Sequence, residues 1–152
     1  MSAAWRIVKR RFSKTAFSGD GARLYGGRWN SPGKRAVYLA GTQSLAILEM
    51  LVHLESAELL TGYVLFRVEI DPQLIRELSP AELPRTWRSW PVSARTQSLG
   101  DQWLERGASA VLQVPSVIAP DEKNYLLNPA HPDFPRLRIS APAPFRFDKR
   151  LL

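Results

Sequence analysis

The sequence predicts a single α+β domain of short strands and a few helices. About six short apolar segments are bounded by glycine, proline and other turn residues, as strands are, and two longer stretches carry helical signals. No internal repeat or low-complexity tract divides residues 1–152. A chain of 152 residues, 45% of them hydrophobic, buries about two-thirds of the surface that its unfolded form exposes. We therefore expect one domain that needs no disulfide or metal for stability.

The first third of the chain contains two strands separated by a glycine-rich segment. Residues 5–8 (WRIV) predict a strand that points Arg6 away from its apolar neighbours Trp5 and Ile7. Residues 13–35 hold few apolar side chains but many glycines and serines, which predicts a long ordered loop or a pair of turns. Such loops in compact domains are usually functional or disordered, and the large apolar side chains of Leu24, Tyr25 and Trp29 favour order here. A second strand is expected over residues 36–40.

A helix is predicted over residues 43–54, with Thr42 as its N-cap. Apolar residues surround the axis of this helix, as they do in helices that are buried on all sides. Its polar stripe is narrow and consists of Glu49, His53 and Ser56. Spacing alone leaves open whether this stripe is a functional surface or the wet edge of a core helix.

Glu49 is the unusual member of that helix. Burying an unpaired carboxylate costs several kcal/mol or more, on the order of the whole stability of a small domain. The nearest cations in the sequence are Arg28, in the turn at residues 26–30 (GGRWN), and Arg6. We expect one of them to compensate Glu49, and a pocket where the cation and the anion meet.

The middle of the chain combines a strand, an irregular crossing and a helix. Residues 62–71 alternate clearly and predict a strand, whereas three prolines forbid a long helix in residues 79–91. That crossing is expected to be pinned by Trp87 and Trp90. A helix is predicted next, over residues 93–106. Four further strands are expected after it, at residues 108–114, 124–127, 136–139 and 145–147.

The composition excludes several classes of protein. The chain has no cysteine, which rules out disulfides, thiolate catalysis and cysteine-based zinc sites. No segment resembles a signal peptide or approaches the roughly 20 apolar residues of a membrane span, so a cytoplasmic protein is expected. The net charge of +7 includes only one basic run, residues 9–11. Scattered arginines suit a small phosphate-bearing ligand or an acidic partner protein as well as a nucleic acid.

Known catalytic motifs are also missing. The sequence lacks a GxxxxGK[ST] phosphate loop and a GxSxG elbow, and its glycine-rich run does not have the context of a dinucleotide fingerprint. His53 and His131 are the only imidazoles, and the carboxylates do not cluster as metal ligands do. No metal site is expected. The remaining reactive groups are arginines, a tyrosine, one glutamate and hydroxyls.

Five sequence pieces together resemble the RES domain, a family named for its Arg, Glu and Ser. In this chain they read WRI (5–7), GGRWN (26–30), VYLA (37–40), LAILEML (45–51) and VPSVIAP (114–120) followed by EKNY (122–125). The resemblance covers essentially the whole chain. It implies a toxin of a bacterial type II toxin–antitoxin module, with an Xre-like helix-turn-helix antitoxin as partner. It also implies a fold like that of ADP-ribosyltransferases and depletion of NAD⁺, which is the substrate and not a bound cofactor.

The resemblance further implies a set of residues that line an NAD⁺ pocket. These are Arg6, Arg28, Tyr38, Glu49 and Ser116, with Asn124 at the rim. Arginine forks suit the diphosphate, and Glu49 suits the cationic sugar that develops when the nicotinamide–ribose bond breaks. We expect Tyr38 to act at the nicotinamide end and Ser116 to bind a ribose or carboxamide group.

Two alternatives remain open. A mono-ADP-ribosyltransferase that modifies a cellular protein would use the same machinery, but Ile47 stands where a second carboxylate, two residues before Glu49, would activate the acceptor. The second alternative, of a different class, is a basic module that binds nucleic acid or a partner protein without catalysis. Direct binding of nucleic acid is not favoured because the positive charge is dispersed.

Overall fold

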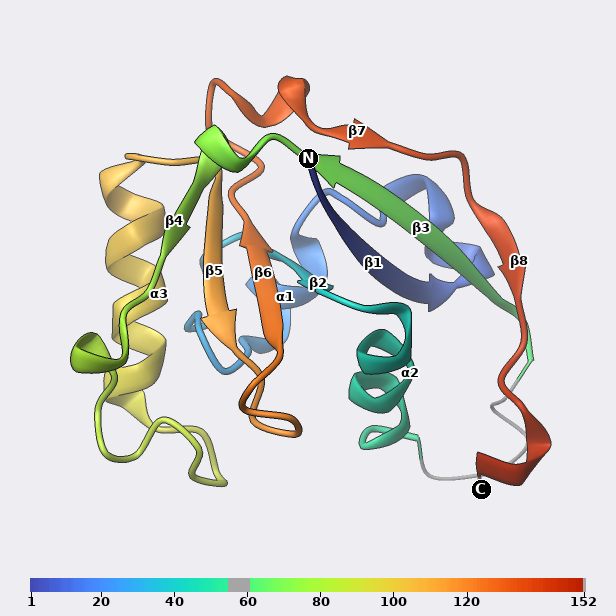
Figure 1. Ribbon diagram of the computed structural model, residues 1–152, viewed down its shortest axis with the longest axis horizontal. Helices are drawn as coiled ribbons and strands as arrows, with labels where there is room; N and C mark the ends of the chain where they lie inside the picture. Colours follow the sequence, from blue (N-terminus) through green and yellow to red (C-terminus); the bar gives the residue numbers. More distant parts are fainter. Residues whose placement is uncertain (55–60, 152) are drawn as a thin grey trace.

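In the computed structural model, which describes residues 1–54 and 61–151, eight strands form one sheet with three α-helices packed around it (Figure 1). The strand order is β4-β5-β6-β2-β1-β3-β7, and β8 also pairs with β3. The strands are β1 (Ser2–Lys9), β2 (Val37–Ala40), β3 (Tyr63–Ile70), β4 (Ile75–Glu77), β5 (Val111–Pro115), β6 (Lys123–Leu127), β7 (Arg138–Ile139) and β8 (Ala143–Phe145). Their pairings are antiparallel except that of β4 with β5, which is parallel. The predicted α+β class is confirmed.

The sheet is weakly joined in its middle. Strands β1 and β3 pair along eight residues, whereas β1 and β2 share a single register pair, Trp5 with Ala40. Helix α2 (Gln43–Leu51) lies below this junction in Figure 1 and contacts both strands. Its buried residues Leu45 and Ala46 belong to the same apolar cluster as Ile7. The helix is thereby held where the two parts of the sheet diverge.

Helix α3 (Ala94–Arg106) covers the β4–β5 end of the sheet (Figure 1). Trp103 is buried against Leu112 and Val114, and Gly107 ends the helix with a left-handed backbone (φ +60°). The predicted helix at residues 93–106 and its glycine stop are confirmed.

The glycine-rich segment contains more regular secondary structure than predicted. Residues 13–35, expected to be a loop, contain the short helix α1 (Asp20–Tyr25). Gly19 and Gly26, both with positive φ, flank that helix. A helix of six residues is too short to show an apolar periodicity, and the side chain of Asn30 stabilises it from outside by donating to the carbonyl of Ala22.

Helix α2 differs from its prediction in two ways. It ends at Leu51 instead of residue 54, and its far side faces solvent, with Leu48 and Val52 exposed. The prediction of a helix buried on all sides was therefore wrong, because the sheet covers only the side that carries Leu45 and Ala46. His53 is exposed, and Ser56 lies outside the described residues.

Several strand boundaries also moved. Strand β1 is longer than residues 5–8, β5 begins at Val111, and β7 is preceded by a 3₁₀ turn instead of starting at residue 136. The last strand is β8 and not residues 145–147, and the three-residue strand β4 was not predicted. Such short strands depend on their neighbours in the sheet more than on a pattern of their own.

The crossing at residues 79–91 is held by one of its two tryptophans. Trp87 stacks on Trp29 with ring centroids 6.4 Å apart, whereas Trp90 is 78% exposed. The prediction that Trp90 pins the crossing was therefore wrong.

Within the described residues, no helix is long and apolar enough to cross a membrane.

Candidate active site

Glu49 lies at the centre of a small cluster of polar side chains. Its Oε1 atom accepts hydrogen bonds from Ser116 Oγ at 3.1 Å and from Asn124 Nδ2 at 2.9 Å. Ser116 follows β5 and Asn124 lies in β6, so these two antiparallel strands deliver both donors to helix α2. Thr42 fixes the start of α2, since its hydroxyl accepts from the amide of Leu45.

The hydroxyl of Ser116 is fully engaged. It donates to Glu49 and accepts from the amides of Ile118 and Ala119, at 3.1 and 3.2 Å, and the residue is completely buried. A hydroxyl has one hydrogen and two lone pairs, so nothing is left for a ribose or carboxamide group. The geometry therefore favours a role in orienting Glu49 over the direct substrate contact expected from the sequence.

Asn124 contributes a donor and leaves an acceptor free. Its amide nitrogen binds Glu49, while its Oδ1 atom is buried and has no hydrogen-bond partner among the described residues. An unsatisfied buried acceptor costs about 1–3 kcal/mol and is uncommon in folded proteins. This atom therefore keeps its capacity to accept a further hydrogen bond.

Arg28 approaches the cluster without bonding to Glu49. Its Nη1 donates to the carbonyls of Trp87 and Ser89, both at 2.9 Å. Burial lowers the pKa of Arg28, and the negative charge of Glu49 acts in the opposite direction. Within residues 1–54 and 61–151, no hydrogen bond or ion pair joins Arg28 to Glu49. The expected compensation of Glu49 comes from two bonded neutral donors, Ser116 and Asn124, whereas Arg28 interacts with Glu49 through its charge alone.

Tyr38 organises the turn that carries Arg28. Its hydroxyl accepts from the amide of Trp29 at 3.0 Å and donates to Oδ1 of Asn30 at 2.6 Å. Burial is the main cause of a raised pKa for Tyr38, which keeps the phenol neutral at physiological pH. A side chain on Gly27 would place its Cβ 2.6 Å from the Tyr38 hydroxyl, so this close approach requires glycine. These contacts favour a positioning role for Tyr38 over the expected action at the nicotinamide end.

Asn30 was part of the GGRWN motif but had no predicted role. It is completely buried, and its Nδ2 lies within 2.9 to 3.2 Å of the carbonyls of Ala22, Ser31 and Lys34. The signal available in the sequence was an asparagine three residues after a pair of glycines, in a segment where backbone groups need side-chain partners. Asn30 thus links helix α1 to the turn.

Arg6 is separated from the Glu49 cluster. Its Nε donates to the carbonyl of Ala16 at 2.8 Å, and its Nη1 to the carbonyl of Tyr38 at 3.0 Å. Val8, which has the same strand parity, packs with Phe66 in an apolar cluster away from α2. Burial lowers the pKa of Arg6 to about 10. The structure places Arg6 against the backbone of Tyr38, where it joins β1 to β2, and among the described residues no hydrogen bond links it to Glu49, Ser116 or Asn124.

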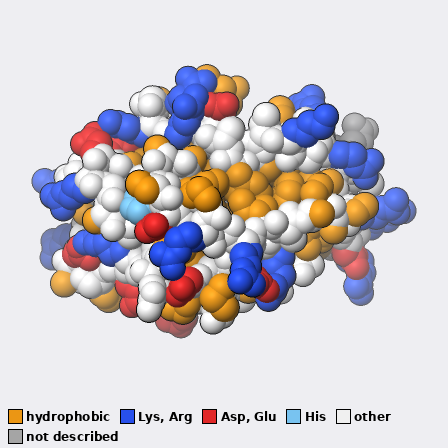
Figure 2. Space-filling view, turned by 90° about the horizontal axis from the view of Figure 1, so that it is seen from above, with side chains coloured by type: hydrophobic (Ala, Val, Ile, Leu, Met, Phe, Trp, Pro, Cys, Tyr) orange, Lys and Arg blue, Asp and Glu red, His pale blue; other side chains and the backbone are white. Residues whose placement is uncertain are grey.

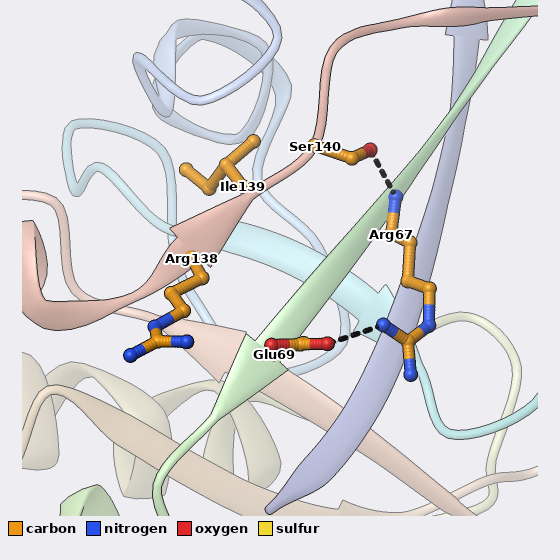
Figure 3. A pocket seen from close by; sticks show the side chains of 5 residues that line it. All are labelled: Arg67, Glu69, Arg138, Ile139 and Ser140. Carbon is orange, nitrogen blue, oxygen red and sulfur yellow. Dashed lines mark hydrogen bonds and ion pairs between the residues drawn. The ribbon is translucent and has the colours of Figure 1, made fainter.

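A separate hollow of about 240 Å³ lies between β3 and β7 (Figure 3). Five residues line this β3–β7 hollow: Arg67, Glu69, Arg138, Ile139 and Ser140. Figure 3 shows the Arg67 side chain bonded to Glu69, at 2.6 Å, and the Arg67 amide bonded to the Ser140 hydroxyl. None of the predicted site residues lines it.

The face that Figure 2 shows carries a continuous apolar patch but no concentration of charge. Lysines and arginines are spread around that face instead of gathering in one patch. Among the described residues, no group of three or more histidines and carboxylates is arranged to hold a metal ion.

Comparison with known proteins identifies the family. A protein-family model described as "RES domain" matches residues 3–148 of this chain. The chain belongs to the RES domain family. Two curated relatives match nearly its whole length. "Toxin Res" of Yersinia enterocolitica is 45% identical over 148 residues, which cover 97% of each chain. "Prs ADP-ribosylating toxin" of Sphingobium sp. is 37% identical over 153 residues, which cover 97% of this chain and 95% of the relative.

A solved structure has the same fold as this RES domain. It is a chain of the M. tuberculosis MbcT–MbcA toxin–antitoxin complex, with a TM-score of 0.77 over 99% of this chain and 86% of that chain. At 19% identity, this similarity supports the fold alone.

Proposed function

We propose that this RES-domain protein is the toxin of a toxin–antitoxin module and that it depletes NAD⁺ by breaking the nicotinamide–ribose bond. The observation that carries the proposal is the state of Glu49, a half-buried carboxylate that two neutral donors hold in place and no cation neutralises among the described residues. The names of the relatives support it, since one is a "Toxin Res" and another an ADP-ribosylating toxin.

Glu49 is suited to stabilising a cationic sugar. When the bond between the ribose C1′ and the nicotinamide nitrogen breaks, the electron pair leaves with nicotinamide and C1′ becomes positively charged. A fixed, unpaired carboxylate stabilises such a charge without reorganising during the reaction. A water oxygen then bonds to C1′ and loses a proton, or an anionic oxygen of phosphate bonds to C1′ without a proton to lose. Because nicotinamide is already a good leaving group, one carboxylate is sufficient.

Asn124 and Arg28 complete the proposed NAD⁺ site. The unpartnered Oδ1 of Asn124 is an acceptor for a ribose hydroxyl beside Glu49. Arg28 uses only Nη1 in its two bonds to carbonyls, so the N–H groups on Nε and Nη2 remain for the diphosphate. The partial burial of Arg28 strengthens such a charge-assisted contact, because fewer water molecules compete for it.

A second candidate is transfer of ADP-ribose to a cellular protein, which the name of the Sphingobium relative favours. Ile47, two residues before Glu49, packs with the apolar cluster around α2 and supplies no second carboxylate near the acceptor. We therefore rank depletion first.

The test is to incubate the purified protein with labelled NAD⁺ and separate the products. Free nicotinamide and free ADP-ribose, or its 1″-phosphorylated form, are expected from the wild type and not from Glu49→Gln. Protein-bound label in an amount equal to the nicotinamide released, with no free ADP-ribose, would instead establish protein modification. Nucleic-acid binding that survives Glu49→Gln, without any NAD⁺ chemistry, would establish the non-enzymatic alternative.

A toxin that consumes NAD⁺ in the cytoplasm needs a partner to silence it. We propose an Xre-like helix-turn-helix antitoxin, and the structural neighbour, which comes from a toxin–antitoxin complex, supports a partner of this kind. Growth arrest on expression of the chain, relieved by co-expression of such a protein, is the expected result.

A further inference from the structure

Helix α3 touches the turn that carries Arg28 through one polar side. Gln97 and Asp101 are one helical turn apart and face the same segment, residues 27–31. Gln97 Nε2 donates to the carbonyl of Gly27 at 3.0 Å. Asp101 accepts from both the amide of Ser31, at 2.9 Å, and the Ser31 hydroxyl. Neither residue belongs to the five sequence pieces that resemble the RES domain.

Gly100 allows the helix to approach this closely. A Cβ added at this position would lie 1.6 Å from the carbonyl oxygen of Trp29 and 2.7 Å from its carbonyl carbon. Glycine inside a helix costs roughly 1 kcal/mol relative to alanine, so its presence here has a structural reason. That reason is direct contact between the helix and the backbone of the turn.

These contacts bracket Arg28. The residue before it, Gly27, is held through its carbonyl by Gln97, and the residue after it, Trp29, rests against Gly100. The Trp29 amide is held from the other side by Tyr38. The backbone of Arg28 is therefore fixed between a helix and a strand that are far apart in the sequence.

We infer that α3 positions Arg28 for the phosphates of the substrate and that Asp101, acting through Ser31, is a positioning residue of the site. The inference rests on the proposed NAD⁺ function. Asp101 does not touch the substrate. Its two bonds to Ser31 prevent the turn from opening at the end opposite Gly26, so that the guanidinium is presented in one place. A displacement of about 1 Å in a substrate-positioning group is enough to cost roughly 10²-fold in rate.

The experiment compares Asp101→Ala with the conservative Asp101→Asn. Alanine removes both acceptors, and kcat/KM for NAD⁺ is expected to fall roughly 10- to 100-fold, mainly through KM. Asparagine keeps an acceptor for the Ser31 amide and a donor for the Ser31 hydroxyl, so it should restore activity to within about threefold of the wild type. The matched control is Glu105→Gln, on the same helix, which removes only an exposed ion pair with Lys34 and should change neither constant.

Hydrogen exchange of the turn separates this inference from the proposed function. The amides of Gly27 and Trp29 donate to Asn30 and Tyr38, and they should exchange at least about tenfold faster in Asp101→Ala than in Glu105→Gln. If the wild type leaves NAD⁺ intact, the proposed function fails. The exchange rates of the two amides still decide whether Asp101 holds the turn: faster exchange in Asp101→Ala than in Glu105→Gln supports it, and equal rates contradict it. If NAD⁺ is cleaved and Asp101→Ala keeps wild-type KM and protection, the inference is overturned while the function stands. Should Asp101→Ala not fold, Ser31→Ala removes the hydroxyl bond alone and is read in the same two assays.

Discussion

The Glu49 cluster and the β3–β7 hollow contain the same kinds of residue in opposite arrangements. Each has a glutamate, an arginine and a serine. In the hollow, Glu69 is bonded to Arg67 at 2.6 Å, and this hydrogen bond holds the pKa of Glu69 below its usual value. In the cluster, Glu49 is bonded to a serine and an asparagine, and Arg28 is engaged with backbone carbonyls.

The difference supports the proposal that Glu49, and not Glu69, is the carboxylate that takes part in the chemistry. An exposed carboxylate paired with an arginine has little interaction left for a developing positive charge, and such surface pairs contribute little to stability. A carboxylate that is oriented by neutral donors keeps its full charge in a site that is partly shielded from water. The proposed site is therefore indicated by the hydrogen-bond partners of Glu49 and Glu69, and not by the position of the β3–β7 hollow.

The largest expected effect is the contrast between Glu49→Gln and Glu69→Gln. Glutamine at position 49 keeps the size of the side chain but loses its charge, so the rate of NAD⁺ loss should fall by at least about 10²-fold. Glutamine at position 69 removes only an exposed ion pair and should leave the rate unchanged. Both rates are measured by nicotinamide release. Equal rates in the two variants would contradict the comparison.

The second contrast uses the two serines. Ser116→Ala removes one of the two donors to Glu49 and an acceptor for two amides, and should lower kcat roughly 10- to 100-fold by freeing the carboxylate to rotate. Ser140→Ala in the hollow removes a bond to the amide of Arg67 and should not change kcat. If KM rose in Ser116→Ala with kcat intact, Ser116 would instead be a direct substrate ligand.

A smaller effect is expected from Tyr38→Phe. Phenylalanine fills the same space but leaves the Trp29 amide and Asn30 Oδ1 without their partner, which should destabilise the turn by about 1–3 kcal/mol and reduce kcat/KM roughly tenfold. Urea unfolding and NAD⁺ kinetics measure the two effects. Tyr25→Phe, at an 85% exposed tyrosine, is the control. Loss of all activity without destabilisation would restore a direct catalytic role for Tyr38.

The smallest effect on activity is expected at Arg6. Lysine cannot reproduce the two bonds of the guanidinium to Ala16 and Tyr38, so Arg6→Lys should lower stability by about 1–3 kcal/mol. The folded fraction should keep a wild-type KM for NAD⁺. A KM raised tenfold at unchanged stability would return Arg6 to the substrate site that the sequence predicted for it.

The sequence predicted the residues of the cluster better than their roles. Glu49, Ser116 and Asn124 were expected in one site because of the family resemblance, and the structure brings them together. The sequence could not reveal that all the hydrogen-bonding capacity of the Ser116 hydroxyl is used. Two of its partners are backbone amides, and the positions of these amides depend on the loop after β5. The same holds for Tyr38, whose hydroxyl meets the turn only after β2 has joined the sheet.

Long-range contacts explain the other differences. Arg6 points to the face of β1 opposite Trp5 and Ile7, as predicted. On that face it bonds to carbonyls that are brought near by the junction of β1 and β2. Helix α2 looked buried because its apolar residues surround the axis, whereas the sheet covers only one side and leaves Leu48 exposed. Gly100 was a local signal that could have been read, because a glycine inside a helical segment indicates close approach of another backbone.

The most direct test of the central claim is a crystal structure of Glu49→Gln with NAD⁺ bound. The claim predicts the ribose of the nicotinamide end between Gln at position 49 and the Oδ1 atom of Asn124, the diphosphate on Nε or Nη2 of Arg28, and Arg6 still bonded to its two carbonyls. NAD⁺ bound in the β3–β7 hollow, or Arg28 turned away from the diphosphate, would contradict it.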